Sequence, residues 1–178
     1  MIDWKNNFGS PSRETTMREA MRLFREREGR LIVETGCYRG IDGDGYSTLH
    51  WAALAKEVNG WFWSVELNPN HAFIALKALQ EFGLRGDVVV GDSVTWLSTY
   101  RQLPIDFLYL DSADFESSDP ISSQLHQLAE AGAAWGKLDP HAIILLDDAG
   151  LKTNLSEDWL QRRGFKVVMK DYQVLLTR

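Results

Sequence analysis

Short apolar runs alternate with amphipathic segments along most of this chain. Five of the runs have the length of buried β-strands, and they cover residues 31–34, 61–66, 88–90, 105–110 and 142–146. The intervening segments carry apolar residues at helical spacing or begin at helix-capping residues. They predict helices over 10–29, 47–58, 69–82, 93–100, 120–135 and 156–163. This alternation is typical of a mainly parallel sheet with helices on both faces.

Two further apolar runs, 165–170 and 172–177, close the chain. One residue separates them, so they can pair only as an antiparallel hairpin. We therefore expect an α/β fold: a doubly wound, Rossmann-like, mainly parallel seven-stranded sheet with a C-terminal antiparallel hairpin. The 178 residues fit a single domain. Residues 1–30 form its N-terminal arm and first helix, and residues 31–178 its core.

Acidic residues stand at the ends of the predicted strands. They are Glu34, Glu66, Asp92, Asp111 and the pair Asp147-Asp148. Because the carboxyl ends of parallel strands form one edge of the sheet, we expect these groups to converge on one crevice. No matching set of Lys or Arg accompanies them in these motifs. The crevice is therefore expected to hold a cation and polar hydroxyl groups.

The charge distribution limits the class of partner. The net charge is −6, and residues 1–30 carry seven basic and five acidic side chains, a local +2, so the remainder carries −8. Because nucleic-acid binding depends mainly on a basic surface, DNA and RNA are disfavoured and a small polar molecule is favoured. We expect no membrane partner, since no apolar stretch approaches about 20 residues. The lack of a secretory pattern and the single Cys37 favour a cytoplasmic protein.

The first strand ends in a glycine-containing turn, Glu34-Thr35-Gly36, that lets a ligand approach the backbone. Glu66, at the end of the second strand, can accept two hydrogen bonds from a ribose diol or be a surface charge. It follows Gly36 by 30 residues, rather than the roughly 20 of a nicotinamide-dinucleotide fingerprint. Asp92 and Ser93 can face an adenine, or Asp92 can simply cap the next helix.

These motifs, in this order, resemble those of class I S-adenosylmethionine-dependent methyltransferases. The similarity covers residues 30–178 and includes the segment Ile-Asp-Phe-Leu-Tyr-Leu-Asp at 105–111 and the closing hairpin. It implies that the core binds S-adenosylmethionine, with the methionine end at the first strand, the ribose at the second and the adenine at the third. The residues assigned to the cofactor are Glu34, Gly36, Gly40, Gly45, Ser47, Glu66, Asp92, Ser93 and Asp111.

Asp111, Asp147 and Asp148 follow neighbouring strands and would repel one another unless something offsets their charge. Mg²⁺ prefers such oxygen ligands. The set resembles the metal site of catechol-type and macrolide-sugar O-methyltransferases, in which the ion binds two substrate oxygens and lowers the pKa of one hydroxyl. The alternative is that Asp147 hydrogen-bonds a loop and Asp148 faces water.

The catalytic base is left open by the sequence. Relatives often place a Lys or His three residues after the first aspartate, where this chain has Asp114, a weak base or a further ligand. We therefore take Asp111 and Asp114 as the candidate catalytic residues. Lys152 can reach the substrate or be a solvated side chain, and His126 is expected to be structural.

The function expected is S-adenosylmethionine-dependent methyl transfer to a hydroxyl of a small polar molecule, assisted by a divalent metal. The alternatives are a metal-independent methyltransferase and a non-catalytic protein that binds S-adenosylmethionine. A homo-oligomer is also open, because an arm that carries Trp4 could reach a neighbouring subunit.

Overall fold

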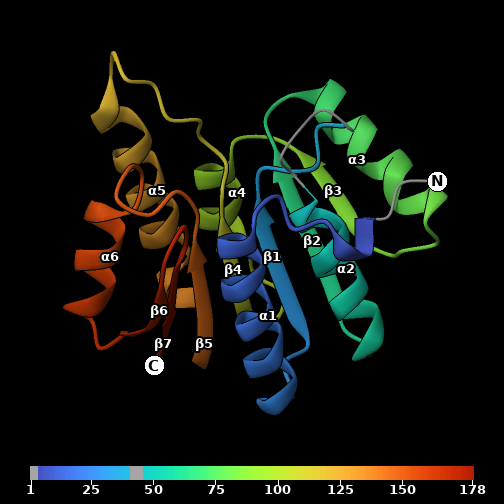
Figure 1. Cartoon of the computed structure of the whole chain (residues 1–178), viewed down its shortest axis with the longest axis horizontal. Helices are drawn as coiled ribbons and strands as arrows, with labels where there is room; N and C mark the ends of the chain where they lie inside the picture. The colour runs from blue at the N-terminus through green and yellow to red at the C-terminus, as the bar shows by residue number, and fades with distance from the viewer. Residues whose placement is uncertain (1–3, 41–45) are drawn as a thin grey trace.

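The computed structural model describes residues 4–40 and 46–178 and contains one seven-stranded sheet (Figure 1). The strand order is β3-β2-β1-β4-β5-β7-β6, and β7 runs antiparallel to both of its neighbours. The expected fold class, including the closing antiparallel pair, is therefore confirmed. The strands are β1 (Leu31–Thr35), β2 (Trp61–Glu66), β3 (Asp87–Val90), β4 (Ile105–Leu110), β5 (Leu138–Leu146), β6 (Lys166–Lys170) and β7 (Val174–Thr177).

The helices begin where the sequence places capping residues. The side chains of Ser10, Asn68, Asp92 and Asp119 each accept a backbone N–H of the following first turn, and three of these four helices begin with a proline. The helices are α1 (Pro11–Glu26), α2 (Ser47–Glu57), α3 (Pro69–Glu81), α4 (Ser93–Thr99), α5 (Pro120–Ala134) and α6 (Asn154–Gln161), with 3₁₀ turns η1 (Trp4–Asn6) and η2 (Trp135–Lys137). Among the described helices, none is long and apolar enough to cross a bilayer.

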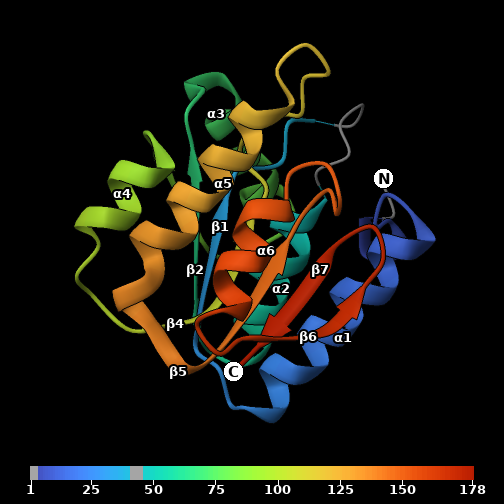
Figure 2. The ribbon, with the colours of Figure 1, turned by 90° about the vertical axis from the view of Figure 1, so that its left-hand side faces the viewer.

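Two apolar cores sandwich the sheet, with helices on both faces (Figure 2). Successive strand residues point to opposite faces, so Phe107 and Tyr109 of β4 pack under α1 and α2, while Leu108 and Leu110 pack under α5. Both faces of the central strands are buried, as expected for parallel strands between helices. This burial fixes the register of the strands and hence the positions of their acidic ends.

The start of one strand differs clearly from the sequence-based expectation. Strand β5 begins at Leu138, four residues before the predicted start at 142, so Pro140 lies within the strand. The register between β4 and β5 shifts next to this segment, and such irregularities are where strands accept a proline. In the described part of the N-terminal arm, Trp4 is buried within the chain, with its ring 5.5 Å from that of His50 and 5.8 Å from that of Phe82. A homo-oligomer stays a prediction.

Candidate functional site

The crevice lies where the strand order reverses, between β1 and β4, and Gly36 lies at its floor. Gly36 has a φ of +81°, and its N–H donates to the carbonyl of Val65 at 2.9 Å. A Cβ atom added to Gly36 would lie 2.4 Å from the backbone oxygen of Asp111. Both the positive φ and this close approach require glycine. The first strand can therefore turn sharply beside β4 and leave space above the sheet edge.

A cavity of about 230 Å³ opens at this edge. Four residues that the sequence predicts as cofactor ligands line it together, namely Gly36, Glu66, Asp92 and Ser93. Of the six strand-end acids that were expected to share one crevice, only Glu66 and Asp92 line this cavity. The remaining lining residues are Val65, Leu67, Gly91, Ser112, Ala113 and His126.

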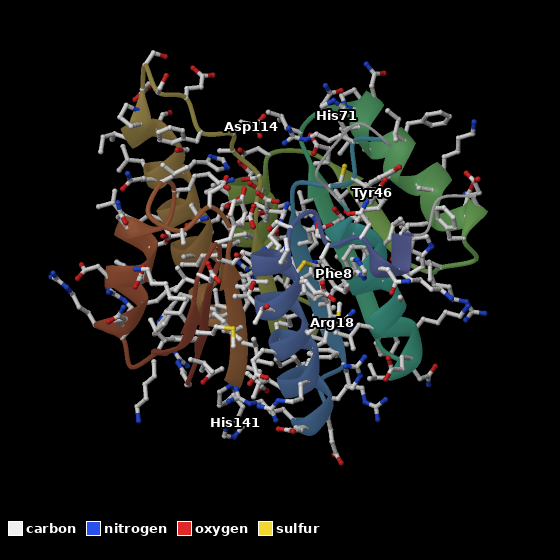
Figure 3. All side chains as sticks on the ribbon, viewed as in Figure 1. Phe8, Arg18, Tyr46, His71, Asp114 and His141 are labelled. Atoms are coloured by element: carbon white, nitrogen blue, oxygen red, sulfur yellow. The ribbon has the colours of Figure 1, made fainter. Side chains whose placement is uncertain are left out.

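Glu66 is held in place by the loop that follows β2. Its side chain is buried, its Oε1 accepts the N–H of Asn68 at 2.8 Å, and Nδ1 of His71 lies 3.8 Å from the same oxygen. Figure 3 shows His71 at the same end of the sheet as Asp114, whereas His141 lies at the opposite end. The carboxylate is therefore fixed at the cavity wall, as a ligand for hydroxyl groups needs to be.

Asp92 and Ser93 serve the fold and the cavity at once. Asp92 is exposed and caps α4 through its 2.7 Å contact with the N–H of Thr95, yet it also lines the cavity. The hydroxyl of Ser93 donates to the buried carboxylate of Glu130 on α5. Helix capping and ligand contact, weighed as alternatives from the sequence, are therefore compatible.

Glu130 and His126 were missed as site residues because both were assigned to an ordinary helix. Ser112 donates to Oε1 of Glu130 at 2.6 Å, and Nε2 of His126 lies 3.4 Å from that oxygen. The hydrogen bond that the imidazole of His126 donates to the Glu130 carboxylate raises the pKa of His126. A histidine and a glutamate four residues apart share one helix face. That spacing, on a helix predicted to cover the sheet, was the available signal.

Glu34 and Ser47 contact each other rather than the described cavity. Ser47 donates to Oε1 of Glu34 at 2.7 Å, and Thr48 donates to Oε2 at 2.6 Å, so the carboxylate holds the first turn of α2. Burial raises the pKa of Glu34 to about 8. Gly40, with a φ of +124°, lies in the same turn away from the cavity lining, and Gly45 falls outside the described residues. Their cofactor roles stay predictions.

Asp111, Asp147 and Asp148 come together as predicted, with one carboxylate oxygen of each within 4.8 Å of the others. Two buried cations accompany them, contrary to the expectation that the acids lack basic partners. Nη2 of Arg13 lies 3.2 Å from both Asp111 and Asp147, and Nζ of Lys152 lies 3.0 Å from both Asp111 and Asp148. Lys152 is 2% exposed, so the interpretation of it as a solvated side chain is wrong.

Every carboxylate oxygen of this acidic cluster has a protein donor or cation within 3.2 Å. Besides the contacts of Arg13 and Lys152, the hydroxyl of Tyr109 donates to Asp111 at 3.1 Å, Gln173 donates to Asp147 at 2.6 Å, and Tyr172 donates to Asp148 at 2.6 Å. The cluster therefore has its own cations and donors within the fold.

Protonation within the cluster follows from burial and from these neighbours. Burial and the nearby Asp111 raise the pKa of Asp147. Burial acts the same way on Asp111, but Lys152 and Arg13 outweigh it and hold the pKa of Asp111 below its ordinary value. If Asp147 keeps its proton, two carboxylates face two cations and the cluster is neutral, which suits a buried position.

Asp114 lies on the rim and pairs with Arg39. Its side chain is 74% exposed, and Nη1 of Arg39 contacts its two oxygens at 3.1 and 2.9 Å. The pair joins the turn after β1 to the loop after β4.

Comparison with known proteins agrees with this geometry. A family model described as a methyltransferase domain matches residues 33–149. The chain belongs to the methyltransferase domain family. The resemblance drawn from the strand-end motifs is thus confirmed, and the match covers β1 to the end of β5, including all the residues that line the cavity.

Individual relatives of this methyltransferase domain extend the comparison. The chain is 28% identical over 130 residues to the O-methyltransferase ankF of Aspergillus thermomutatus, covering 71% of this chain and 48% of the relative. It therefore spans about half the length of that curated protein.

Solved structures share the fold. The SAH-bound methyltransferase PaMTH1 of Podospora anserina has a TM-score of 0.71 at 15% identity, over 100% of this chain and 88% of the other. A 16S rRNA N2 G1207 methyltransferase of T. thermophilus, in complex with AdoMet and guanosine, has a TM-score of 0.63 at 16% identity, over 91% of this chain and 42% of the other.

Proposed function

We propose that this methyltransferase domain transfers the methyl group of S-adenosylmethionine to a hydroxyl of a small polar molecule. The observation that carries the proposal is the convergence of Gly36, Glu66, Asp92 and Ser93 on one cavity at the carboxyl edge of the sheet. Membership of the family supports the reaction class. The named activity of the curated relative, an O-methyltransferase, supports oxygen as the acceptor atom.

The chemistry of the cavity suits a cofactor rich in hydroxyl and amino groups. Glu66 presents a fixed carboxylate that can accept hydrogen bonds from a ribose, and Asp92 stands where an adenine amino group could donate. Glu66 follows Gly36 by 30 residues, rather than the roughly 20 of a nicotinamide-dinucleotide fingerprint. This spacing favours S-adenosylmethionine over a nicotinamide dinucleotide.

The molecule that accepts the methyl group is proposed to bind next to the acidic cluster of Asp111, Asp147 and Asp148. Asp111 follows β4 directly, its backbone oxygen faces Gly36, and its side chain is partly exposed. Methyl transfer is an in-line displacement in which the acceptor oxygen forms a bond to the methyl carbon as the carbon–sulfur bond breaks, S-adenosylhomocysteine leaves, and the hydroxyl proton passes to Asp114 or to solvent. Such a reaction depends mainly on positioning and on nearby charge. Asp111 is proposed to orient the acceptor hydroxyl, and Asp114, held by Arg39, to act at most as a weak base.

A divalent metal at Asp111, Asp147 and Asp148 would supply Lewis-acid activation of the hydroxyl. The donor set present in the fold does not fit such an ion well, because five of the six carboxylate oxygens already accept a hydrogen bond, the sixth is paired with Lys152, and two buried cations lie among them. The metal-independent form of the reaction is therefore the one that we propose.

Calorimetry tests the proposed cofactor. We expect S-adenosylmethionine and S-adenosylhomocysteine to bind and NAD not to bind. Glu66→Gln should weaken binding roughly ten- to a hundredfold, since hydrogen bonds to a charged group contribute about 1.5–3 kcal/mol. Glu81→Gln, at the exposed end of α3, is the matched control and should bind normally. Absence of binding by both methionine compounds would reject the proposal.

Product detection tests the reaction itself. Incubation with methyl-labelled S-adenosylmethionine and a panel of polyhydroxylated small molecules should give labelled ether products. Normal cofactor binding without any product across the panel would favour the non-catalytic alternative.

A further inference from the structure

The loop between β5 and α6 carries Lys152 back into the acidic cluster. Asp148 has a φ of +56°, and its carbonyl accepts the N–H groups of Leu151 and Lys152, each at 3.0 Å. Asp is one of the few residues that tolerate this left-handed conformation. The tight turn reverses the chain. The side chain of Lys152 therefore reaches back to Asp111 and Asp148 and is 2% exposed.

The ammonium group lies between the ends of two neighbouring strands. Its nitrogen is 3.0 Å from Oδ1 of Asp111, after β4, and 3.0 Å from Oδ2 of Asp148, after β5. These are hydrogen-bond distances for an ammonium, longer than the roughly 2.1 Å of a Mg²⁺–oxygen bond. Lys152 thus occupies the position between the strand-end carboxylates at which a divalent ion would bind.

The cluster is also unfavourable for an added ion on charge grounds. Lys152 forms ion pairs at 3.0 Å with both Asp111 and Asp148 and already places one positive charge between them. Arg13 supplies a second buried cation from α1. A divalent ion entering here would face two positive charges at short range in a medium of low dielectric constant.

We propose that Lys152 replaces a divalent cation in this methyltransferase domain. Its ammonium group holds Asp111 and Asp148 in position, and Arg13 completes the neutralisation on the other side of Asp111. Lys152 is a positioning residue, because its burial keeps it from the acceptor. The proposal refines the proposed function, but its main test measures metal binding and does not depend on catalysis.

Mn²⁺ is the probe, because its electron paramagnetic resonance signal distinguishes free from bound ion. We expect the wild-type protein to leave the Mn²⁺ signal unchanged. Lys152→Met keeps an unbranched apolar side chain and removes the ammonium group, which frees one oxygen each on Asp111 and Asp148. This variant should bind about one Mn²⁺. Lys170→Met removes an exposed lysine that pairs with Glu157 and should behave like the wild type.

Two outcomes would overturn the proposal. Binding of Mn²⁺ by the wild type would mean that Lys152 does not exclude an ion. Absence of binding by both the wild type and Lys152→Met would mean that the acids do not form a metal site once the lysine is gone. If Lys152→Met does not fold alone, its refolding with and without Mn²⁺ replaces the binding assay: recovery with metal supports the proposal, and no recovery overturns it.

Chelation separates this proposal from the proposed function. Wild-type methyl transfer and S-adenosylmethionine binding should be unchanged in EDTA, and their loss would overturn the role of Lys152. A protein that neither binds the cofactor nor transfers methyl groups, with or without EDTA, would reject the proposed function, while the Mn²⁺ result would still decide the role of Lys152.

Discussion

Replacement of Gly36 by alanine tests the close approach of β1 to β4 at the floor of the cavity. The added Cβ would lie 2.4 Å from the backbone oxygen of Asp111, and the backbone would keep a φ of +81°. Two free-energy costs therefore combine. One is the strain of a left-handed backbone at a residue with a Cβ atom, and the other is the clash of that atom with the Asp111 carbonyl oxygen, which belongs to the backbone and cannot rotate away as a side chain can. The Asp111 backbone must move, and with it the edge that faces the cavity.

The size of the effect follows from those two costs. Left-handed backbone costs a non-glycine residue about 1–2 kcal/mol, and forcing an extra methyl group into a packed site costs about 1–3 kcal/mol more. A change of 1 kcal/mol shifts the melting temperature of a domain of this size by about 2–4 °C. Gly36→Ala should therefore lower the melting temperature by about 4–20 °C.

Gly150 provides a matched control. Its φ is +80°, nearly that of Gly36, but nothing lies within 4 Å of an added Cβ. Gly150→Ala should lose only the about 1–2 kcal/mol of stability that left-handed backbone strain costs, and it should bind S-adenosylhomocysteine normally. Gly36→Ala should lose more stability and should bind S-adenosylhomocysteine at least about tenfold more weakly. Thermal melts and calorimetry measure both effects. Equal melting temperatures and equal affinities in the two variants would refute the reasoning.

Three further predictions concern buried charge. Burial raises the pKa of Glu34 to about 8 from an ordinary 4.5, so between these values the folded protein holds a proton that the unfolded chain has lost, and the free energy of unfolding should fall as pH rises from about 5 to about 8. In urea unfolding, Glu34→Gln should show a smaller dependence of that free energy on pH over this window. An unchanged dependence would contradict the assignment. Arg13→Met should destabilise the fold by about 3–5 kcal/mol in thermal or urea unfolding, because it removes the cation paired with the buried carboxylates of Asp111 and Asp147. The control Arg162→Met breaks an exposed ion pair and should cost about 1 kcal/mol or less. Similar losses in the two variants would argue against the buried pairing. Glu130→Gln should lower the pKa of His126 in an NMR titration, because the hydrogen bond that His126 donates to the Glu130 carboxylate raises that pKa. An unchanged pKa would reject this contact.

Local sequence patterns predicted the elements because their causes are local. A capping side chain and a proline mark the start of α3 and of α5, and these signals do not depend on what the helices later pack against. The same holds for the closing hairpin, whose short connection leaves no other pairing. The position of β7 between β5 and β6 is different. It depends on which strand edge was left open by the rest of the sheet, and no local pattern encodes that.

The strand-end acids show the same division within the site. Their convergence followed from the alternation of strands and helices, because parallel strands must end at one edge. Their charge partners did not, because Arg13 is separated from Asp111 by 98 residues and from Asp147 by 134. The packing of α1 over the sheet brings it there. Lys152 is only four residues from Asp148, but its burial depends on the left-handed turn at that aspartate.

The sequence by itself thus determined the fold class, the helix caps and the edge of the sheet at which the cavity opens. Only the tertiary structure decided what balances the charge of Asp111, Asp147 and Asp148. The physical reason is that the free energy of a buried charge depends on every group within a few ångströms of it, from any part of the chain. Sequence spacing reports neighbours along the chain, whereas the electrostatics of this cluster depends on neighbours in space.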